Sequence, residues 1–273
     1  MKKIITLVLS LMMAIVATIS MTACNDDKTI KIGVQEGPTS LMYAECLKGT
    51  SVSSYTTFPL AAEAMKNGNV NYVICDKATA TSICNTIEGI KYVDIALSTE
   101  FNAIAMDKNQ PELGSSINAI LEDNAEKIQA IIDKYMAGDE ENYVGVAKGE
   151  KDSANADSQL VVATNAEFPP WEYVDGELYY GIDMEIAALI AEELGMELVI
   201  DDMAFESVIS AVGNHGVDIA MSGITITNER KDVVNFSTSY YTESIVVVCK
   251  ENDDSFASAG TVVDVLGILC ANK

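Results

Sequence analysis

The chain is short of basic residues and contains a single histidine. Its 273 residues include 17 Lys and Arg against 41 Asp and Glu, which gives a formal net charge of −24. Binding a nucleic-acid backbone requires a basic surface, so this deficit argues against nucleic acid as a partner. The same excess of acid favours solubility and repels the chain from anionic lipid headgroups.

The six cysteines form no Cys-x-x-Cys pair, and no second histidine accompanies them. Beyond Cys24 their number is odd, and their spacing is not that of zinc ligands. We therefore predict no metal site, no cofactor and no disulfide framework. Most of them are expected to be buried as small apolar side chains. Their pairing stays open at this point: Cys46, Cys75, Cys84, Cys249 and Cys270.

The N-terminal segment has the pattern of an export signal. Residues 1–23 consist of two lysines near the start, an apolar run and a short stretch of small residues. The residues before Cys24 resemble the lipobox of bacterial lipoproteins, which implies cleavage and lipid attachment at Cys24; the alternative is an ordinary secretory signal. Removing residues 1–23 takes away two lysines, so the mature charge is 15 − 41 = −26. We expect an extracytoplasmic protein that a lipid at Cys24 holds to the membrane.

From residue 29 onward, short β-branched runs alternate with helical patterns. Residues 30–34 and 70–74 read as strands, and residues 60–65 between them read as a helix. Such alternation indicates βαβ units and a mostly parallel sheet. Residues 111–136 carry isoleucine and leucine at helical spacing, which predicts a pair of amphipathic helices.

A polar stretch over residues 138–159 has the composition of a solvated linker, and the alternation of strands and helices restarts at residue 160. The two halves share one repeated pattern: in each half, a helix ends in a Gly-containing turn that leads into a buried strand. This pattern leaves Asp76 and Gly223 at equivalent places beyond the carboxyl ends of two strands. Ligands of open α/β sheets bind at that edge.

Several motifs resemble the polar amino-acid receptors of bacterial ABC importers. Motifs similar to the first lobe of these receptors occupy residues 164–172, 181–185, 221–230 and 234–237, and motifs similar to the second lobe occupy residues 32–40 and 60–76. They keep the family's internal spacing, but the two halves occur in reverse order. The chain therefore resembles a circularly permuted member of the family.

The resemblance implies an α/β, two-lobed periplasmic binding protein type 2 fold. Each lobe is expected to be a sandwich of strands and helices with a mostly parallel sheet, and the ligand cleft is expected between the lobes. The predicted organisation is a signal peptide (1–23), an anchor segment (24–28), lobe 2 (29–98), a return strand and helices completing lobe 1 (99–137), a linker (138–159), lobe 1 (160–250) and a tail near the hinge (251–273).

In this family a zwitterionic ligand requires one cation and one anion in fixed places, because burying either charge unpaired is costly. Arg230 matches the arginine that pairs with the ligand carboxylate. Asp76, from the other lobe, matches the acid that accepts the ammonium. The plainer interpretations are an exposed helical arginine and a helix N-cap before Lys77.

The same resemblance assigns the remaining contacts. Thr39 and Thr225 match hydroxyl donors, Gly223 matches a backbone contact, and Phe168 and Phe205 match aromatic walls, for which core packing is the alternative. Asn165 stands where some receptors of basic amino acids have Asp, and Pro38 stands where relatives have Ser or Thr, so the side-chain specificity is open. The full predicted ligand set is Arg230, Asp76, Thr225, Gly223, Ser222, Thr39, Phe168, Phe205, Asn165 and Gln35.

The mechanism that the resemblance implies is hinge closure of a monomer, whose closed form the importer's membrane subunits recognise. One chain crossing is expected near residues 98–103, and the other is expected to be cut, which predicts a loose hinge. The alternatives are an enzyme on the same scaffold, similar to cyclohexadienyl dehydratases or lytic transglycosylases, a sensor input domain, and a rearranged product that folds poorly. No catalytic constellation is visible around His215 or Cys75.

Overall fold

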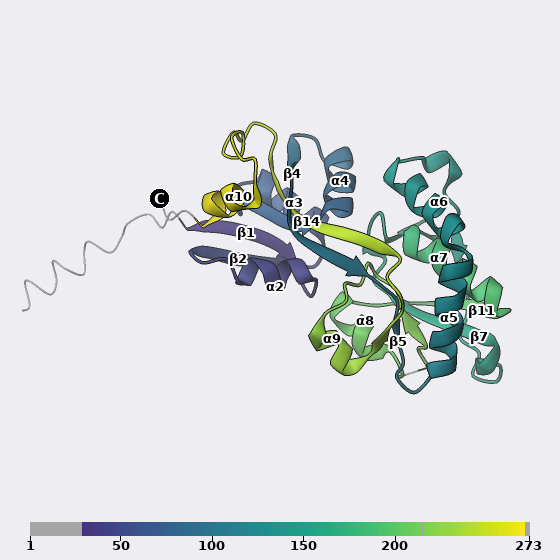
Figure 1. Ribbon diagram of the computed structural model, residues 1–273. Helices are drawn as coiled ribbons and strands as arrows, with labels where there is room; N and C mark the ends of the chain where they lie inside the picture. Colours follow the sequence, from purple (N-terminus) through teal and green to yellow (C-terminus); the bar gives the residue numbers. More distant parts are fainter. Residues whose placement is uncertain (1–28, 215, 271–273) are drawn as a thin grey trace, which may run out of the picture.

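The computed structural model describes residues 29–214 and 216–270, which form two α/β lobes (Figure 1). The predicted signal peptide, the anchor segment with Cys24, and His215 lie outside these residues. Among the helices of the described ranges, none has both the length and the apolar character needed to cross a membrane.

Lobe 2 is built on a five-stranded sheet in the order β2-β1-β3-β14-β4. Strands β1, β2 and β3 are mutually parallel, and β14 runs antiparallel between β3 and β4. The strands are β1 (Ile30–Gln35), β2 (Thr50–Tyr55), β3 (Tyr72–Asp76), β4 (Ile90–Asn102) and β14 (Tyr241–Lys250). The helices are α2 (Thr39–Glu45), α3 (Phe58–Lys66), α4 (Lys77–Thr86) and α10 (Val262–Leu269).

Lobe 1 repeats this plan with a sheet in the order β11-β7-β12-β5-β13, in which only β5 runs against its neighbours. Its strands are β5 (Ala105–Met106), β7 (Gln159–Thr164), β11 (Glu197–Asp202), β12 (Ile219–Ala220) and β13 (Asn235–Phe236). Its helices are α5 (Pro111–Asp123), α6 (Ala125–Met136), α7 (Ile182–Leu194), α8 (Phe205–Ala211) and α9 (Asn228–Val233). A smaller sheet contains β6 (Val146–Ala147), β8 (Glu167–Phe168), β9 (Glu172–Asp175) and β10 (Leu178–Tyr180). The expected mostly parallel sheets are confirmed in both lobes.

Segments far apart in the sequence join in lobe 1 through the carboxylate of Glu185 on α7. It accepts hydrogen bonds from Lys134 Nζ at 2.6 and 2.7 Å, from Tyr135 Oη at 2.8 Å and from Val144 N at 2.9 Å. Tyr135 Oη also accepts a bond from Gly181 N. A buried carboxylate needs such partners, and here they fasten α6 to α7.

The segment predicted as a solvated linker is packed onto lobe 1. It contains two short 3-10 helices, η1 (Glu140–Asn142) and η2 (Ala156–Ser158), with β6 between them. Strand β6 pairs with β10, and Ile200 N donates to Lys148 O at 2.7 Å. The polar composition reflects surface exposure of the side chains, while the backbone is held by its hydrogen bonds.

The structure differs from the predicted boundary at residue 250 and from the predicted cut crossing. Strand β14 pairs with β3 and β4 in the sheet of lobe 2, so two strands, β4 and β14, connect the lobes (Figure 1). Residues 245–249 are apolar and fully buried between these neighbours. An apolar run predicts a buried strand but not the sheet that it joins, which explains the error. A loose hinge was predicted because only one chain crossing was expected, so the second connecting strand removes the reason for that prediction.

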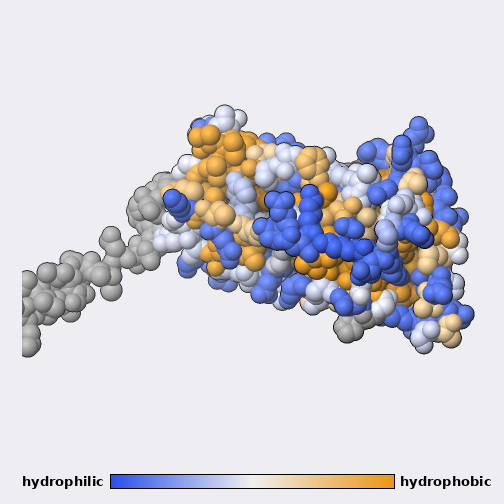
Figure 2. Space-filling view, turned by 60° about the horizontal axis from the view of Figure 1, so that its bottom comes forward, coloured by the Kyte–Doolittle hydropathy of each residue, from blue (hydrophilic) through white to orange (hydrophobic). Residues whose placement is uncertain are grey.

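The tail predicted near the hinge is part of the core of lobe 2. Val265 and Leu269 of α10 are fully buried in one cluster with Ile32 and Val34 of β1. In Figure 1, α10 lies beside β1, at the end of the lobe that is far from lobe 1. Val263 on the other side of α10 is 72% exposed. In Figure 2, apolar residues gather at this outer end of lobe 2, and hydrophilic residues cover much of the rest of the face.

Candidate binding site between the lobes

A cavity of about 470 Å³ opens where the two lobes meet. Glu36 and Thr56 line it from lobe 2, and Asn165 and Phe205 are among the residues that line it from lobe 1. Beside it, Gln35 Nε2 donates across the lobes to Asn165 Oδ1 at 3.3 Å. The cavity therefore adjoins residues that the sequence predicts for the ligand site.

Arg230 contacts both lobes. Thr227 caps α9 by accepting from Arg230 N at 3.2 Å, which fixes the first turn of the helix. The guanidinium donates to Thr225 O at 2.8 Å and to Gly37 O of lobe 2 at 3.4 Å, and it lies 5.7 Å from the centre of the Phe205 ring. Burial lowers the pKa of Arg230, and the negative charges of Glu100 and Asp76 oppose that effect.

Asp76 ends β3, is 5% exposed and is not among the residues that line the interlobe cavity. It occupies the N-cap position of α4, but its side chain makes no capping hydrogen bond. Its Oδ1 atom is buried and has no hydrogen-bond partner in the described part of the chain. Burial, followed by the charges of Glu243 and Glu100, raises the pKa of Asp76 well above its usual value. The unpartnered Oδ1 can accept a hydrogen bond from an incoming cation, whose charge would also favour the ionised form of the carboxyl.

Two glutamates that the sequence did not single out complete the charged part of the site. Glu100 on β4 faces Glu243 across the strand ladder, because the two residues are paired in register. Glu243 is 2% exposed, and burial raises its pKa to about 7 although the backbone N–H groups of Ser244, Ala78 and Lys77 act in the other direction. Neither glutamate belongs to a motif, and only their positions on the two connecting strands could have indicated them.

The threonines predicted as ligand donors both contact Glu100. Thr39 Oγ1 of lobe 2 donates to Glu100 Oε2 at 2.5 Å, and Thr225 Oγ1 of lobe 1 donates to the same oxygen at 2.7 Å. Ser98 Oγ donates to the other oxygen at 3.4 Å. The structure thus brings Thr39, Thr225, Arg230 and Asp76 together around the connecting strands.

Ser222 and Gly223 each donate a hydrogen bond to a buried acid of lobe 1. Ser222 Oγ donates to Glu172 Oε1 at 2.6 Å, and Gly223 N donates to Asp183 Oδ2 at 2.8 Å. Burial is the main cause that raises the pKa of Asp183 to about 6. The hydroxyl of Ser222 therefore points into lobe 1, and a ligand contact from Gly223 would have to use its carbonyl group.

Aromatic rings meet across the two lobes. The rings of Phe168 in lobe 1 and Phe58 in lobe 2 have centroids 5.6 Å apart. Phe205 packs against Gly37, where an added Cβ would lie 2.7 Å from its ring. Phe168 and Phe205 were predicted as walls of the site, whereas Phe58 was not, because its sequence context is that of an ordinary buried helical residue.

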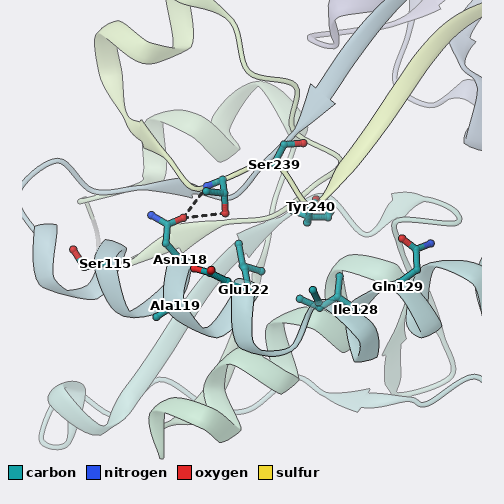
Figure 3. Close-up of a pocket in the computed structure, with 11 residues that line it drawn as sticks. Ser115, Asn118, Ala119, Glu122, Ile128, Gln129, Ser239 and Tyr240 are labelled. Carbon is teal, nitrogen blue, oxygen red and sulfur yellow. Dashed lines mark hydrogen bonds between the residues drawn. The ribbon is translucent and has the colours of Figure 1, made fainter.

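A second cavity, of about 720 Å³, lies in lobe 1 away from these residues (Figure 3). Asn118 and Glu122 of α5 line it together with Tyr240, and Asn118 Oδ1 accepts from Thr238 N at 2.7 Å. Its lining residues, all in the described part of the chain, include one acid and no cation. A zwitterion would leave its carboxylate unpaired there, so the interlobe site is the better candidate.

Two α/β lobes, each built on a five-stranded sheet, form the two-lobed fold that the sequence predicted. Residues 160–262 match the model of the bacterial extracellular solute-binding proteins, family 3. This match supports the family that was recognised from the sequence, whereas the permuted order stays a prediction. The matched part runs from lobe 1 through β14 into α10.

The relatives that match are named as binding proteins. The chain is 38% identical over 100 residues to the arginine-binding extracellular protein ArtP of Bacillus subtilis (strain 168). This match covers 37% of the chain and 39% of ArtP. The chain is 33% identical over 97 residues to the putative ABC transporter arginine-binding protein 2 of Escherichia coli (strain K12), covering 35% and 40%. The chain thus spans about two fifths of the length of these relatives.

Among solved structures, the chain is similar to the arginine-bound form of domain 1 from TmArgBP. The identity is 31%, the match covers 44% of this chain and 98% of that one, and the TM-score is 0.31.

Proposed function

We propose that the chain is the extracytoplasmic receptor of an ABC importer and binds a free amino acid between its lobes. Arg230 pairs with the ligand carboxylate, and Asp76 accepts the ammonium from the opposite lobe. The observation that carries this proposal is that Asp76 Oδ1 is buried without a hydrogen-bond donor among the described residues, while the carboxyl interacts electrostatically with Arg230. Closure of the lobes then follows from contacts that the ligand makes with both.

The first ligand to test is arginine. The acidic groups of Asp76, Glu100 and Glu243 interact electrostatically with one another, and the guanidinium of Arg230 interacts with Asp76 and Glu100. A second cation on the ligand side chain would offset this excess of negative charge. The names of the matched relatives support the same choice, since both relatives described above are named as arginine-binding.

A thermal-shift screen of residues 25–273 against the twenty amino acids and ornithine tests the proposal. A ligand present at about 100 times its Kd stabilises the folded state by about 2.7 kcal/mol, which raises the melting temperature by roughly 5–10 °C for a protein of this size. We expect such a shift with arginine. A cooperative melt that no amino acid shifts would contradict the proposed function.

We propose further that a lipid at Cys24 anchors the receptor, that it acts as a monomer, and that its segments are circularly permuted. The order supports the last point, because the part that matches the family begins at residue 160, while residues 29–102 supply β1 to β4 of lobe 2 ahead of it. The importer's membrane subunits are the expected partners.

A further inference from the structure

The carboxylate of Glu100 lies on the hydroxyl groups that the proposed function assigns to a ligand. Its Oε2 atom accepts from Thr39 of lobe 2 and from Thr225 of lobe 1, at 2.5 and 2.7 Å. Among the negative charges that oppose the effect of burial on the pKa of Arg230, the charge of Glu100 has the largest effect. A protein carboxylate therefore has the donors and the cation that a ligand carboxylate needs.

The two carboxylates cannot share these donors. A threonine hydroxyl has one O–H, so Thr39 and Thr225 can each donate to Glu100 or to a ligand, but not fully to both. Adding the ligand's charge while Glu100 stays in place would bring another carboxylate next to Asp76 and Glu243, around one guanidinium. Like charges at such short range repel strongly when they are partly buried.

Glu100 has a route out of the site. It lies near the end of β4, close to where this strand enters lobe 1, and its side chain is half-buried. Ser98 Oγ, on the same face of the strand two residues earlier, contacts its second oxygen at only 3.4 Å. A change of side-chain rotamer would release both threonines and move the carboxylate toward solvent.

We propose that Glu100 is a built-in competitor for the ligand carboxylate. It joins the two lobes through Thr39 and Thr225, and an amino acid must displace it in order to bind. The inference rests on the proposed function and adds to it a residue that lowers affinity for carboxylate-bearing ligands. A ligand that has the cationic groups but lacks the carboxylate does not need the threonines and does not displace Glu100.

Calorimetry with L-arginine and its decarboxylated counterpart, agmatine, tests this inference on wild type and Glu100→Ala. We expect the ratio of arginine affinity to agmatine affinity to rise roughly tenfold or more in Glu100→Ala. In this variant the hydroxyl groups of Thr39 and Thr225 are free to donate charge-assisted hydrogen bonds to the ligand carboxylate. Glu88→Ala, which removes an exposed acid of lobe 2 outside the site, is the matched control and is expected to leave the ratio unchanged.

The outcomes separate this inference from the proposed function. A wild type that binds arginine with the same ratio as Glu100→Ala, or with a higher one, would overturn the role of Glu100 alone. An equal rise in Glu88→Ala would also overturn it, because the effect would then be one of net charge. If neither wild type nor Glu100→Ala binds either compound, arginine is not the ligand and the role of Glu100 in arginine binding is overturned, while the screen of the twenty amino acids decides the proposed function. Binding of arginine by Glu100→Ala but not by wild type would support the competition by Glu100 and contradict arginine as the ligand of the wild type.

Discussion

Replacing Gly37 with alanine should obstruct the contact between the lobes. Gly37 has φ +96°, and an added Cβ would lie 2.7 Å from Cδ1 of Phe205, which belongs to the other lobe. Two carbon atoms have their optimal separation at about 3.5–4.0 Å, so one lobe would have to move. Overpacking of this kind costs about 1–3 kcal/mol.

The substitution has a second cost that does not depend on closure. A left-handed backbone costs a residue with a Cβ about 1–2 kcal/mol, and it does so whether the lobes are together or apart. This cost lowers the melting temperature but cancels in the affinity. The clash with Phe205 exists only when the lobes meet, so it alone weakens binding, by roughly 5- to 150-fold.

A double-mutant cycle measured by calorimetry with L-arginine separates the two costs. Gly37→Ala, Phe205→Ala and the double variant are compared with wild type. Because alanine at position 205 removes the ring that the new methyl group meets, Gly37→Ala should lose much less affinity in that background. If Gly37→Ala binds as wild type does, or loses the same affinity with and without the Phe205 ring, the reasoning about closure is wrong.

Two further predictions concern stability. The pKa of Glu243 is about 7 in the fold against an ordinary value of 4.5. Its contribution to the free energy of unfolding is therefore complete below about pH 4.5 and is lost as the pH rises through 7. This pKa difference corresponds to on the order of 3 kcal/mol. Glu243→Gln should therefore flatten the fall in melting temperature between pH 5 and pH 8, and an unchanged fall would count against this. Val265→Ala should destabilise the fold by about 1–2 kcal/mol because the side chain is fully buried, whereas Val263→Ala, 72% exposed, should change it little; equal effects in chemical denaturation would refute the place of α10 in the core.

Much of the fold could be predicted from local pattern. The β-branched run before Gln35 and the apolar stretch before Asp76 predict β1 and β3, because alternation with helices at this spacing favours parallel strands. The sheet that β14 joins could not be predicted in this way. Its residues 245–249 are apolar throughout, and an apolar strand packs equally well between the neighbours of either lobe.

The residues of the candidate site likewise fall into those that the local sequence predicts and those that it does not. Arg230, Asp76 and the two threonines could be predicted because they lie in motifs that resemble a known family. Glu100 and Glu243 could not, because their role comes from the pairing of β4 with β14, a contact between residues far apart in the sequence. Ser222 lies in a motif, but the partner that turns its hydroxyl inward, Glu172, is fifty positions away.

In the proposed function, Arg230 and Asp76, from opposite lobes, hold the two charges of one amino acid. Titration calorimetry of L-arginine against wild type, Arg230→Gln and Asp76→Asn measures this most directly. We expect one ligand per chain for wild type and a loss of affinity of roughly a hundredfold or more in each variant, because each variant leaves a buried ligand charge without its partner. Wild-type affinity in both variants, with the fold intact by thermal melting, would contradict this assignment.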